Sequence, residues 1–192
     1  MRSMRLVSLV LLLAVAISGS LYFRHAVLSP PDPVVEGHLV SVGDDVRQLI
    51  GPVATVAESE SGIEFKARVD TGATHCSIHV AEWEIESPAE NMAENVGKTI
   101  RFRTENRCGR SEWLEREIAA VDLVKTSEKS EWRYLVRMNL HHNGVEREVL
   151  VSLNDRSRMS YPVLVGRNYL AGHFVVDVAS SRTESLLANE RR

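Results

Sequence analysis

The stretch I-E-F-K-A-R-V-D-T-G-A-T-H-C-S-I-H, residues 63–79, decides how the rest of the chain is interpreted. Its first seven residues alternate between apolar and charged side chains, which is the period-two pattern of a strand with one buried face. The strand delivers Asp70 into the turn Asp70-Thr71-Gly72-Ala73, where Gly72 permits backbone approaches that a side chain would block. A carboxylate held in this way suits acid-type peptide hydrolysis, in which two carboxylates share one proton and activate a water.

Asp-Thr-Gly alone is weak evidence, because aspartate and glycine are ordinary turn residues. A second stretch near the C-terminus strengthens the hydrolase interpretation. It reads Y-P-V-L-V-G-R-N-Y-L, residues 161–170, and places Gly166, Arg167 and Asn168 directly after an apolar run. With the two stretches in this order, the chain resembles the retropepsin-like aspartic proteases.

A closer resemblance covers residues 40–178 and points to the bacterial family labelled ATP-dependent zinc proteases, whose motifs are retropepsin-like. It is carried by K-A-R-V-D-T-G-A and S-I-H, residues 66–73 and 77–79, and by L-N-D-R-S-R-M-S-Y-P running into V-L-V-G-R-N, residues 153–168. The sequence contains neither an ATP-binding glycine loop nor a His-Glu-x-x-His motif. No motif in this chain therefore supports the words ATP-dependent and zinc in the family label.

The resemblance implies an all-β, retropepsin-like closed barrel with one short helix and one catalytic aspartate, Asp70, in each chain. A dyad would then require a homodimer, with the Asp70 of each chain meeting at the two-fold axis. The implied supporting residues are Thr71 bracing the turns, Gly72 admitting the substrate backbone, and Gly166 packing on the Asp70 turn, together with Ala73, His79, Arg167 and Asn168.

One departure from the family pattern concerns Thr74. In viral members an acid stands at this position and pairs with the arginine after the second glycine. Arg167 therefore needs another acceptor, such as a backbone carbonyl or a different acid. The flap is also undefined by sequence, with the Asn143-Gly144 hairpin and the loop at residues 106–110 as candidates.

Strand-like runs fill the rest of the domain. We expect strands at residues 49–58, 63–70, 77–80, 99–104, 117–125, 132–142, 145–153, 163–165 and 174–178, with an acidic loop at residues 82–95 and a short helix near residues 168–171. Asn143-Gly144 lies between two of these runs and predicts a hairpin, because both turn residues need positive φ. Trp83, Trp113 and Trp132 are interpreted as core or loop anchors.

Composition limits the function classes. The 23 basic and 26 acidic residues give a formal charge of −3, which argues against a nucleic-acid-binding protein. The two cysteines, Cys76 and Cys108, have no paired spacing, and whether they form a disulfide stays open. His75, Cys76 and His79 lie close in sequence, but a metal enzyme needs three or four converging ligands, so we expect no metal and no cofactor.

The N-terminus predicts export. Residues 6–23 form an uncharged apolar run of about 18 residues, near the lower limit for a membrane-spanning helix, after two arginines that orient the N-terminus inside. We divide the chain into an anchor or signal at residues 1–25, a Pro-rich tether at 26–36, the peptidase domain at 37–180 and a polar tail at 181–192. In a bacterium this places the domain in the periplasm, held by a single-pass inner-membrane helix; secretion after signal cleavage is the alternative.

The leading hypothesis is a membrane-anchored aspartic endopeptidase that acts on a peptide or protein substrate as a homodimer. Two alternatives from other classes stay open. One is a non-catalytic envelope domain that binds a partner on the same fold, and the other is a metal-dependent peptidase.

Overall fold

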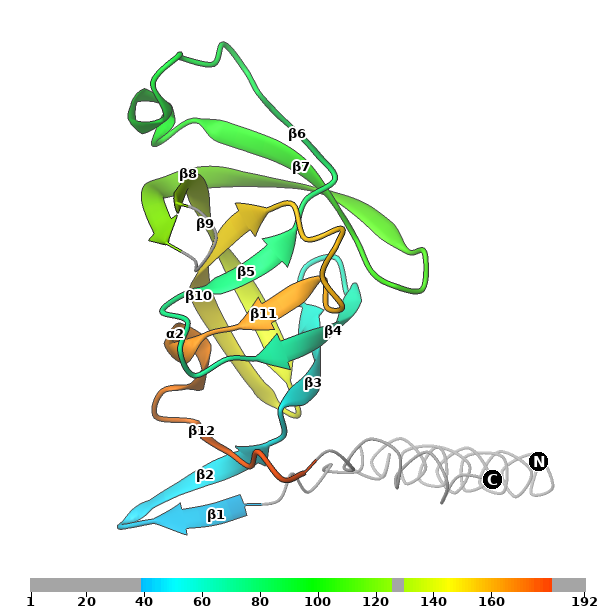
Figure 1. Cartoon of the computed structure of the whole chain (residues 1–192), viewed down its shortest axis with the longest axis vertical. Helices are drawn as coiled ribbons and strands as arrows, with labels where there is room; N and C mark the ends of the chain where they lie inside the picture. The colour runs from blue at the N-terminus through cyan, green and yellow to red at the C-terminus, as the bar shows by residue number, and fades with distance from the viewer. Residues whose placement is uncertain (1–38, 126–129, 181–192) are drawn as a thin grey trace, which may run out of the picture. The chain divides into compact units, whose positions relative to one another are not determined.

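The computed structural model describes residues 39–125 and 130–180 (Figure 1). The predicted membrane segment, the Pro-rich tether and the polar tail lie outside these residues. Within the two described ranges, no helix has the length and apolar character needed to cross a membrane.

The described part of the chain is mostly β-structure. In chain order the strands are β1 (Leu39–Val42), β2 (Asp45–Ile50), β3 (Val53–Glu58), β4 (Glu64–Val69), β5 (Cys76–His79), β6 (Glu82–Ile85), β7 (Thr99–Glu105), β8 (Ser111–Lys125), β9 (Ser130–His142), β10 (Val145–Asn154), β11 (Val163–Val165) and β12 (Phe174–Val176). A 3-10 turn, η1 (Met92–Asn95), follows β6, and the short helix α2 (Arg167–Leu170) follows β11. The predicted class, mostly β with one short helix, is confirmed.

Strand β4 has one buried face, as its alternating sequence predicts. Phe65, Ala67 and Val69 are buried on one face, whereas the charged residues between them are exposed. β4 pairs antiparallel with β3 on one side and parallel with β11 on the other. The parallel pairing with β11 places the two halves of the sequence motif side by side (Figure 1).

Six strands pair in a ring around the core. β10 pairs with β5, β5 with β11, β11 with β4, β4 with β3, β3 with β9, and β9 returns to β10. The predicted closed barrel itself stays a prediction. The buried side chains inside it form one apolar cluster that includes Phe65, Ile78, Val136 and Tyr169.

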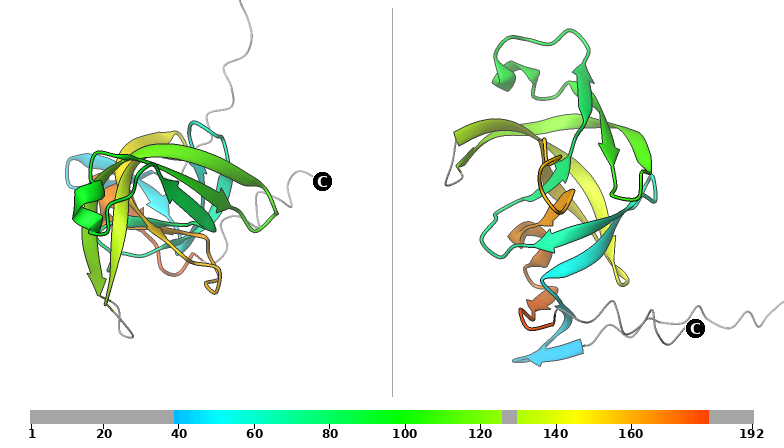
Figure 2. Two further views of the ribbon diagram at one scale, coloured as in Figure 1. Left: turned by 90° about the horizontal axis from the view of Figure 1, so that it is seen from above. Right: turned by 45° about the vertical axis from the view of Figure 1, so that its right-hand side comes forward.

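Two further groups of strands lie outside the ring. β8 continues from β9 as a long antiparallel ribbon, and β7 and β6 follow it in the same sheet (Figure 2). β1, β2 and β12 form a separate three-stranded sheet, in which β12 runs parallel to β2.

The hairpin predicted at Asn143-Gly144 is confirmed. β9 and β10 pair antiparallel on either side of it, and Asn143 and Gly144 have φ values of 46° and 80°. These positive values are the conformation that the two-residue turn requires.

Several boundary predictions are wrong. The strand expected at residues 49–58 is divided at Gly51-Pro52 into β2 and β3, because proline cannot donate a ladder hydrogen bond. The loop expected at residues 82–95 contains β6, whose E-W-E-I pattern pairs with β7. The three tryptophans are not core residues, since Trp83, Trp113 and Trp132 are 54%, 41% and 58% exposed.

Candidate active site

The Asp70 turn begins where β4 ends beside β11. The Asp70 amide donates to the Val165 carbonyl at 3.0 Å, which extends the pairing of the two strands by one bond. The Gly72 amide donates to the Asp70 carboxylate at 2.8 Å, and the Ala73 amide donates to the Asp70 carbonyl at 3.3 Å. The half-buried carboxylate is therefore fixed by its own turn and does not depend on a distant partner for its orientation.

Gly166 packs against the Asp70 turn so closely that only glycine fits. A Cβ added at Gly166 would lie 2.5 Å from the His75 carbonyl oxygen and 2.6 Å from its carbon. Real Cβ atoms do not approach backbone atoms this closely, so the turn would have to move. The close approach lets the next amide, that of Arg167, donate to the Ala73 carbonyl at 2.9 Å.

Arg167 finds its acceptors within the same turn. Its guanidinium donates to the Thr71 carbonyl at 3.1 Å, the Gly72 carbonyl at 2.8 Å and the Thr74 hydroxyl at 3.0 Å. Thr74 thus supplies an oxygen at the position where viral relatives carry an acid. Arg167 therefore needs no acid at position 74, because it binds Thr71, Gly72 and Thr74 without a carboxylate.

Asn168 links the segment after the Asp70 turn to β10 through side-chain hydrogen bonds. Its Oδ1 accepts hydrogen bonds from the Cys76 amide at 3.0 Å and from the Cys76 thiol at 3.2 Å, and its Nδ2 donates to the Leu150 carbonyl at 2.7 Å. Burial raises the pKa of the Cys76 thiol to about 11, so this thiol stays neutral. Cys76 is a packing and hydrogen-bonding residue, and the second cysteine, Cys108, is a free, exposed thiol.

A cavity of about 580 Å³ opens beside Asp70. Its walls come from the Asp70 turn, from residues 122–125 of β8, and from the ends of β9 and β10. The side chains that matter most for chemistry in it are Asp70, His75, Ser77, Asp122, Arg133 and Arg156. Neither predicted flap candidate lines this cavity, because β8 occupies the position beside Asp70.

Two buried arginines give the cavity a positive wall. Arg133 and Arg156 are 8% and 9% exposed, and both line the cavity with Asp70. Burial lowers the pKa of the Arg156 guanidinium, as does the nearby charge of Arg133, whereas the Asp70 carboxylate raises it. Within the described part of the chain, Arg133 Nε and Ser77 Oγ are buried without a hydrogen-bond partner, which is uncommon for buried polar atoms.

A histidine and an aspartate connect the turn to β8. His75 Nδ1 lies 3.6 Å from Asp122 Oδ2, and both side chains line the cavity. This contact is one of the few that join the Asp70 turn to the β8 segment that covers it.

His79 lies outside the Asp70 cavity. Its Nδ1 accepts a hydrogen bond from the Arg156 amide at 3.0 Å and lies 3.7 Å from Asp155. Burial lowers the pKa of His79, an effect that Asp155 partly opposes. His79 therefore positions the backbone of Arg156, and only through Arg156 does it act on the site.

The structure brings the two sequence motifs together around the Asp70 turn, but sequence reasoning missed the far wall of the cavity. Arg133, Asp122 and Arg156 were not singled out, although Arg156 stands inside the quoted L-N-D-R-S-R run. Among the residues that the structure describes, no three His, Cys, Asp or Glu side chains gather in a way that could hold a metal ion.

Comparison with known proteins places these features in a family. A family model described as "RimB-like: Retropepsin-like aspartic endopeptidase RimB" matches residues 51–185. A protein of Desulfotalea psychrophila named "Probable alpha-L-glutamate ligase" is 28% identical over 141 residues, which are 71% of this chain. The match spans only 29% of that relative's length.

A solved structure shares the fold. It is the protein Lpg0085 of Legionella pneumophila, described as of unknown function, and it aligns with a TM-score of 0.56 at 25% identity over 70% of this chain and 96% of its own. The family match covers well over half of the chain and includes both the Asp70 turn and the Gly166 segment. The chain belongs to the RimB-like family of retropepsin-like aspartic endopeptidases.

Proposed function

We propose that this protein is an aspartic endopeptidase that hydrolyses peptide bonds as a homodimer, with Asp70 of each chain forming the catalytic dyad. The supporting observation is the Asp70 carboxylate, held by the Gly72 amide at the edge of a cavity. One chain carries one Asp-Thr-Gly turn, so the second carboxylate comes from a second copy across a two-fold axis.

In this dimer the two Asp70 carboxyls share one proton, so that one is ionised and the other is neutral. The ionised carboxylate takes a proton from the attacking water, and the neutral one donates a hydrogen bond to the scissile carbonyl. The new C–O bond forms a tetrahedral intermediate. As the C–N bond breaks, the leaving amine nitrogen takes up a proton, and the dyad returns to its starting state.

The substrate class we propose is a peptide with an acidic side chain near the scissile bond. Arg133 and Arg156 lie in the Asp70 cavity, and arginine is the preferred partner of a carboxylate. The name of one relative refers to L-glutamate, which is an acidic amino acid of the kind that these arginines would bind. The proposal concerns side-chain recognition and does not depend on which protein supplies the peptide.

We further propose that residues 6–23 anchor the protein in the inner membrane with its domain in the periplasm. The support is the uncharged apolar run after two arginines. Fractionation of cells that express the full chain should place it in the membrane pellet, resistant to extraction by carbonate. Release into the soluble periplasm with a shortened N-terminus would favour signal cleavage.

The test of the enzyme proposal is replacement of Asp70. Asp70→Asn should lower the rate of cleavage of an acidic peptide library by about 10²–10⁴-fold, the usual contribution of a general acid–base group. Asp45→Asn is the matched control, because Asp45 is an exposed β2 aspartate whose side chain contacts Arg47. Equal activity of Asp70→Asn and wild type would overturn the proposal. Loss of wild-type activity on chelation would favour the metal-dependent alternative, and intact folding with no cleavage would favour a binding domain.

A further inference from the structure

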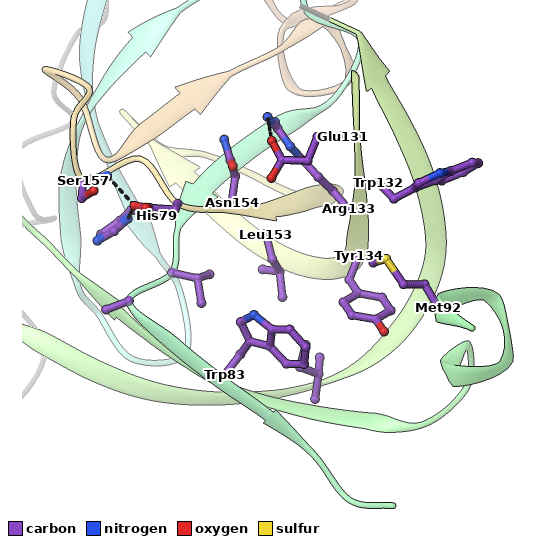
Figure 3. A pocket seen from close by; sticks show the side chains of 14 residues that line it. His79, Trp83, Met92, Glu131, Trp132, Arg133, Tyr134, Leu153, Asn154 and Ser157 are labelled. Atoms are coloured by element: carbon purple, nitrogen blue, oxygen red, sulfur yellow. Dashed lines mark hydrogen bonds and ion pairs between the residues drawn. The ribbon is translucent and has the colours of Figure 1, made fainter. Parts of the chain in front are cut away.

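A second cavity of about 610 Å³ lies next to the Asp70 cavity (Figure 3). Its walls come from the ends of β5 and β10, from β6 and η1, and from the start of β9. The function proposed above does not use this cavity.

One side of the second cavity is apolar and aromatic, whereas charged and polar side chains line the rest. Trp83, Tyr134 and Leu153 all line it, and Figure 3 shows these side chains grouped around one open space. The rings of Trp83 and Tyr134 meet edge to face with centroids 5.8 Å apart. The Tyr134 hydroxyl accepts a hydrogen bond from Asn95 at 2.9 Å, so its polar end is already engaged.

The exposure of Trp83 points to a ligand. Trp83 is 54% exposed although it lines a cavity. A large aromatic side chain left open to water beside other apolar groups gains stability when an apolar group covers it. The ligand for this space therefore carries a bulky apolar group.

The second cavity adjoins the Asp70 cavity, because the two share lining residues. Arg133 and Asn154 line both of them. After Asn154 the chain alternates between the two, since Arg156 lines the Asp70 cavity whereas Asp155 and Ser157 line the second one. A single extended ligand can therefore reach both spaces.

The spacing of the two cavities matches an extended peptide. Ser77 of β5 lines the Asp70 cavity, and His79, two positions further on the same strand, lines the second one. Two positions of a strand span about 6.5–7 Å, which is also the distance between alternate side chains of an extended peptide. Arg133 lines both cavities and so lies beside a peptide that occupies them.

We propose that the second cavity is a substrate subsite. It binds a large apolar side chain, aromatic or branched aliphatic, of the peptide that is cleaved. This side chain lies two residues from the one that occupies the Asp70 cavity. The assignment rests on the proposed endopeptidase function, and it adds a specificity that the buried arginines do not provide.

The test starts from the cleavage sites of the full-length enzyme in detergent on a mixed peptide pool, read by mass spectrometry. Two synthetic peptides with the preferred sequence then carry Phe or Ala at the apolar position. Wild type should cleave the Phe peptide with a kcat/KM about 10- to 100-fold higher than the Ala peptide, the usual range for filling an apolar pocket.

Trp83→Ala should reduce that ratio to within about threefold of one, because the wall that contacts the side chain is gone. Trp113→Ala is the matched control. Trp113, on β8, is also exposed, but its ring contacts the Arg101 guanidinium and lies outside both cavities. Ala81→Trp supplies the converse change, because it places a bulky ring in the cavity and should reverse the preference towards Ala. Circular dichroism melting identifies any variant that does not fold.

The possible failures are distinguishable. The subsite proposal is overturned if cleavage depends on Asp70 but shows no preference for a bulky apolar residue. It is also overturned if Trp83→Ala and Ala81→Trp both leave such a preference intact. In either case the endopeptidase function still stands. Absence of any cleavage that depends on Asp70 overturns both.

Discussion

At the scale of single residues, Gly166 controls the geometry of the Asp70 turn. Gly166→Ala should lower the free energy of unfolding by about 1–3 kcal/mol and abolish cleavage, because its Cβ would lie 2.5 Å from the His75 carbonyl oxygen. Urea unfolding followed by circular dichroism measures the first effect and a peptide assay the second.

Gly62→Ala is the control for this prediction. Gly62 has a φ of 64° with no atom near the position of a Cβ, so alanine there adds backbone strain alone, about 1 kcal/mol. Activity should survive this change. Full activity of Gly166→Ala would show that the turn can move away without affecting Asp70.

His79 is the residue whose titration should affect stability. Burial lowers its pKa in the folded state below the ordinary value of 6.5, so the unfolded chain binds the proton first as the pH falls. Stability then rises with pH in this range and declines as the pH drops below about 6.5. Protonation also removes the acceptor at Nδ1, to which the Arg156 amide donates.

His79→Asn should flatten this dependence, because its amide oxygen can still accept from the Arg156 amide and does not titrate in this range. We expect the melting temperature of wild type to fall more between pH 7.5 and pH 5 than that of the variant. Parallel curves for the two proteins would contradict a role for His79 in this pH dependence.

At the scale of elements, the tip of the β7–β8 hairpin supports the segment that carries Arg156. Arg107, at this tip, donates to the carbonyls of Ser157 and Met159. Arg107→Ala should loosen this segment and raise KM more than it lowers kcat, because Arg156 contacts the cavity and does not carry the reacting proton.

Hydrogen exchange at residues 155–160 gives a direct readout of that loosening. Arg110→Ala is the matched control, since Arg110 lies at the same hairpin tip but donates to the carbonyls of Ser61 and Gly62. Unchanged exchange in Arg107→Ala would mean that the segment is held by its own contacts.

Local sequence patterns predicted those elements whose own residues determine them. The alternation in β4 and the Asn143-Gly144 turn are both readable from neighbouring residues, and both are confirmed. β1 and the first part of β2 were missed, because their half-exposed and charged residues carry no clear alternation. The acidic residues and Pro88 that suggested a loop at residues 82–95 hid β6, which forms by pairing with β7.

At the scale of the whole molecule, the proposed dyad makes activity a property of the dimer. Mixing wild type with an equal amount of Asp70→Asn, under conditions that allow exchange, should reduce activity to about one half, because half of the wild-type chains then sit in mixed dimers. Steady-state cleavage at constant wild-type concentration measures this. An Asp45→Asn chain added in the same amount should cause no loss, and an unchanged rate with Asp70→Asn would indicate that single chains are active.

The site as a whole was only half predictable. Thr71, Gly72, Ala73, Gly166, Arg167 and Asn168 could be chosen because two short motifs contain them. Arg133 reaches the cavity from β9 and Arg156 from the segment after β10, and their convergence depends on the pairing of β9 with β10 and of β10 with β5. No local pattern encodes that pairing, so the positive wall of the cavity becomes visible only in the folded chain.

The Asp70 turn is fastened by Asn168, which follows Cys76 by 92 positions in the chain. During synthesis, the segment with Asp70 leaves the ribosome long before Asn168 is added to the chain. A nascent or truncated chain without Asn168 therefore lacks the hydrogen bonds that join Cys76, at the end of the loop after Asp70, to the C-terminal segment.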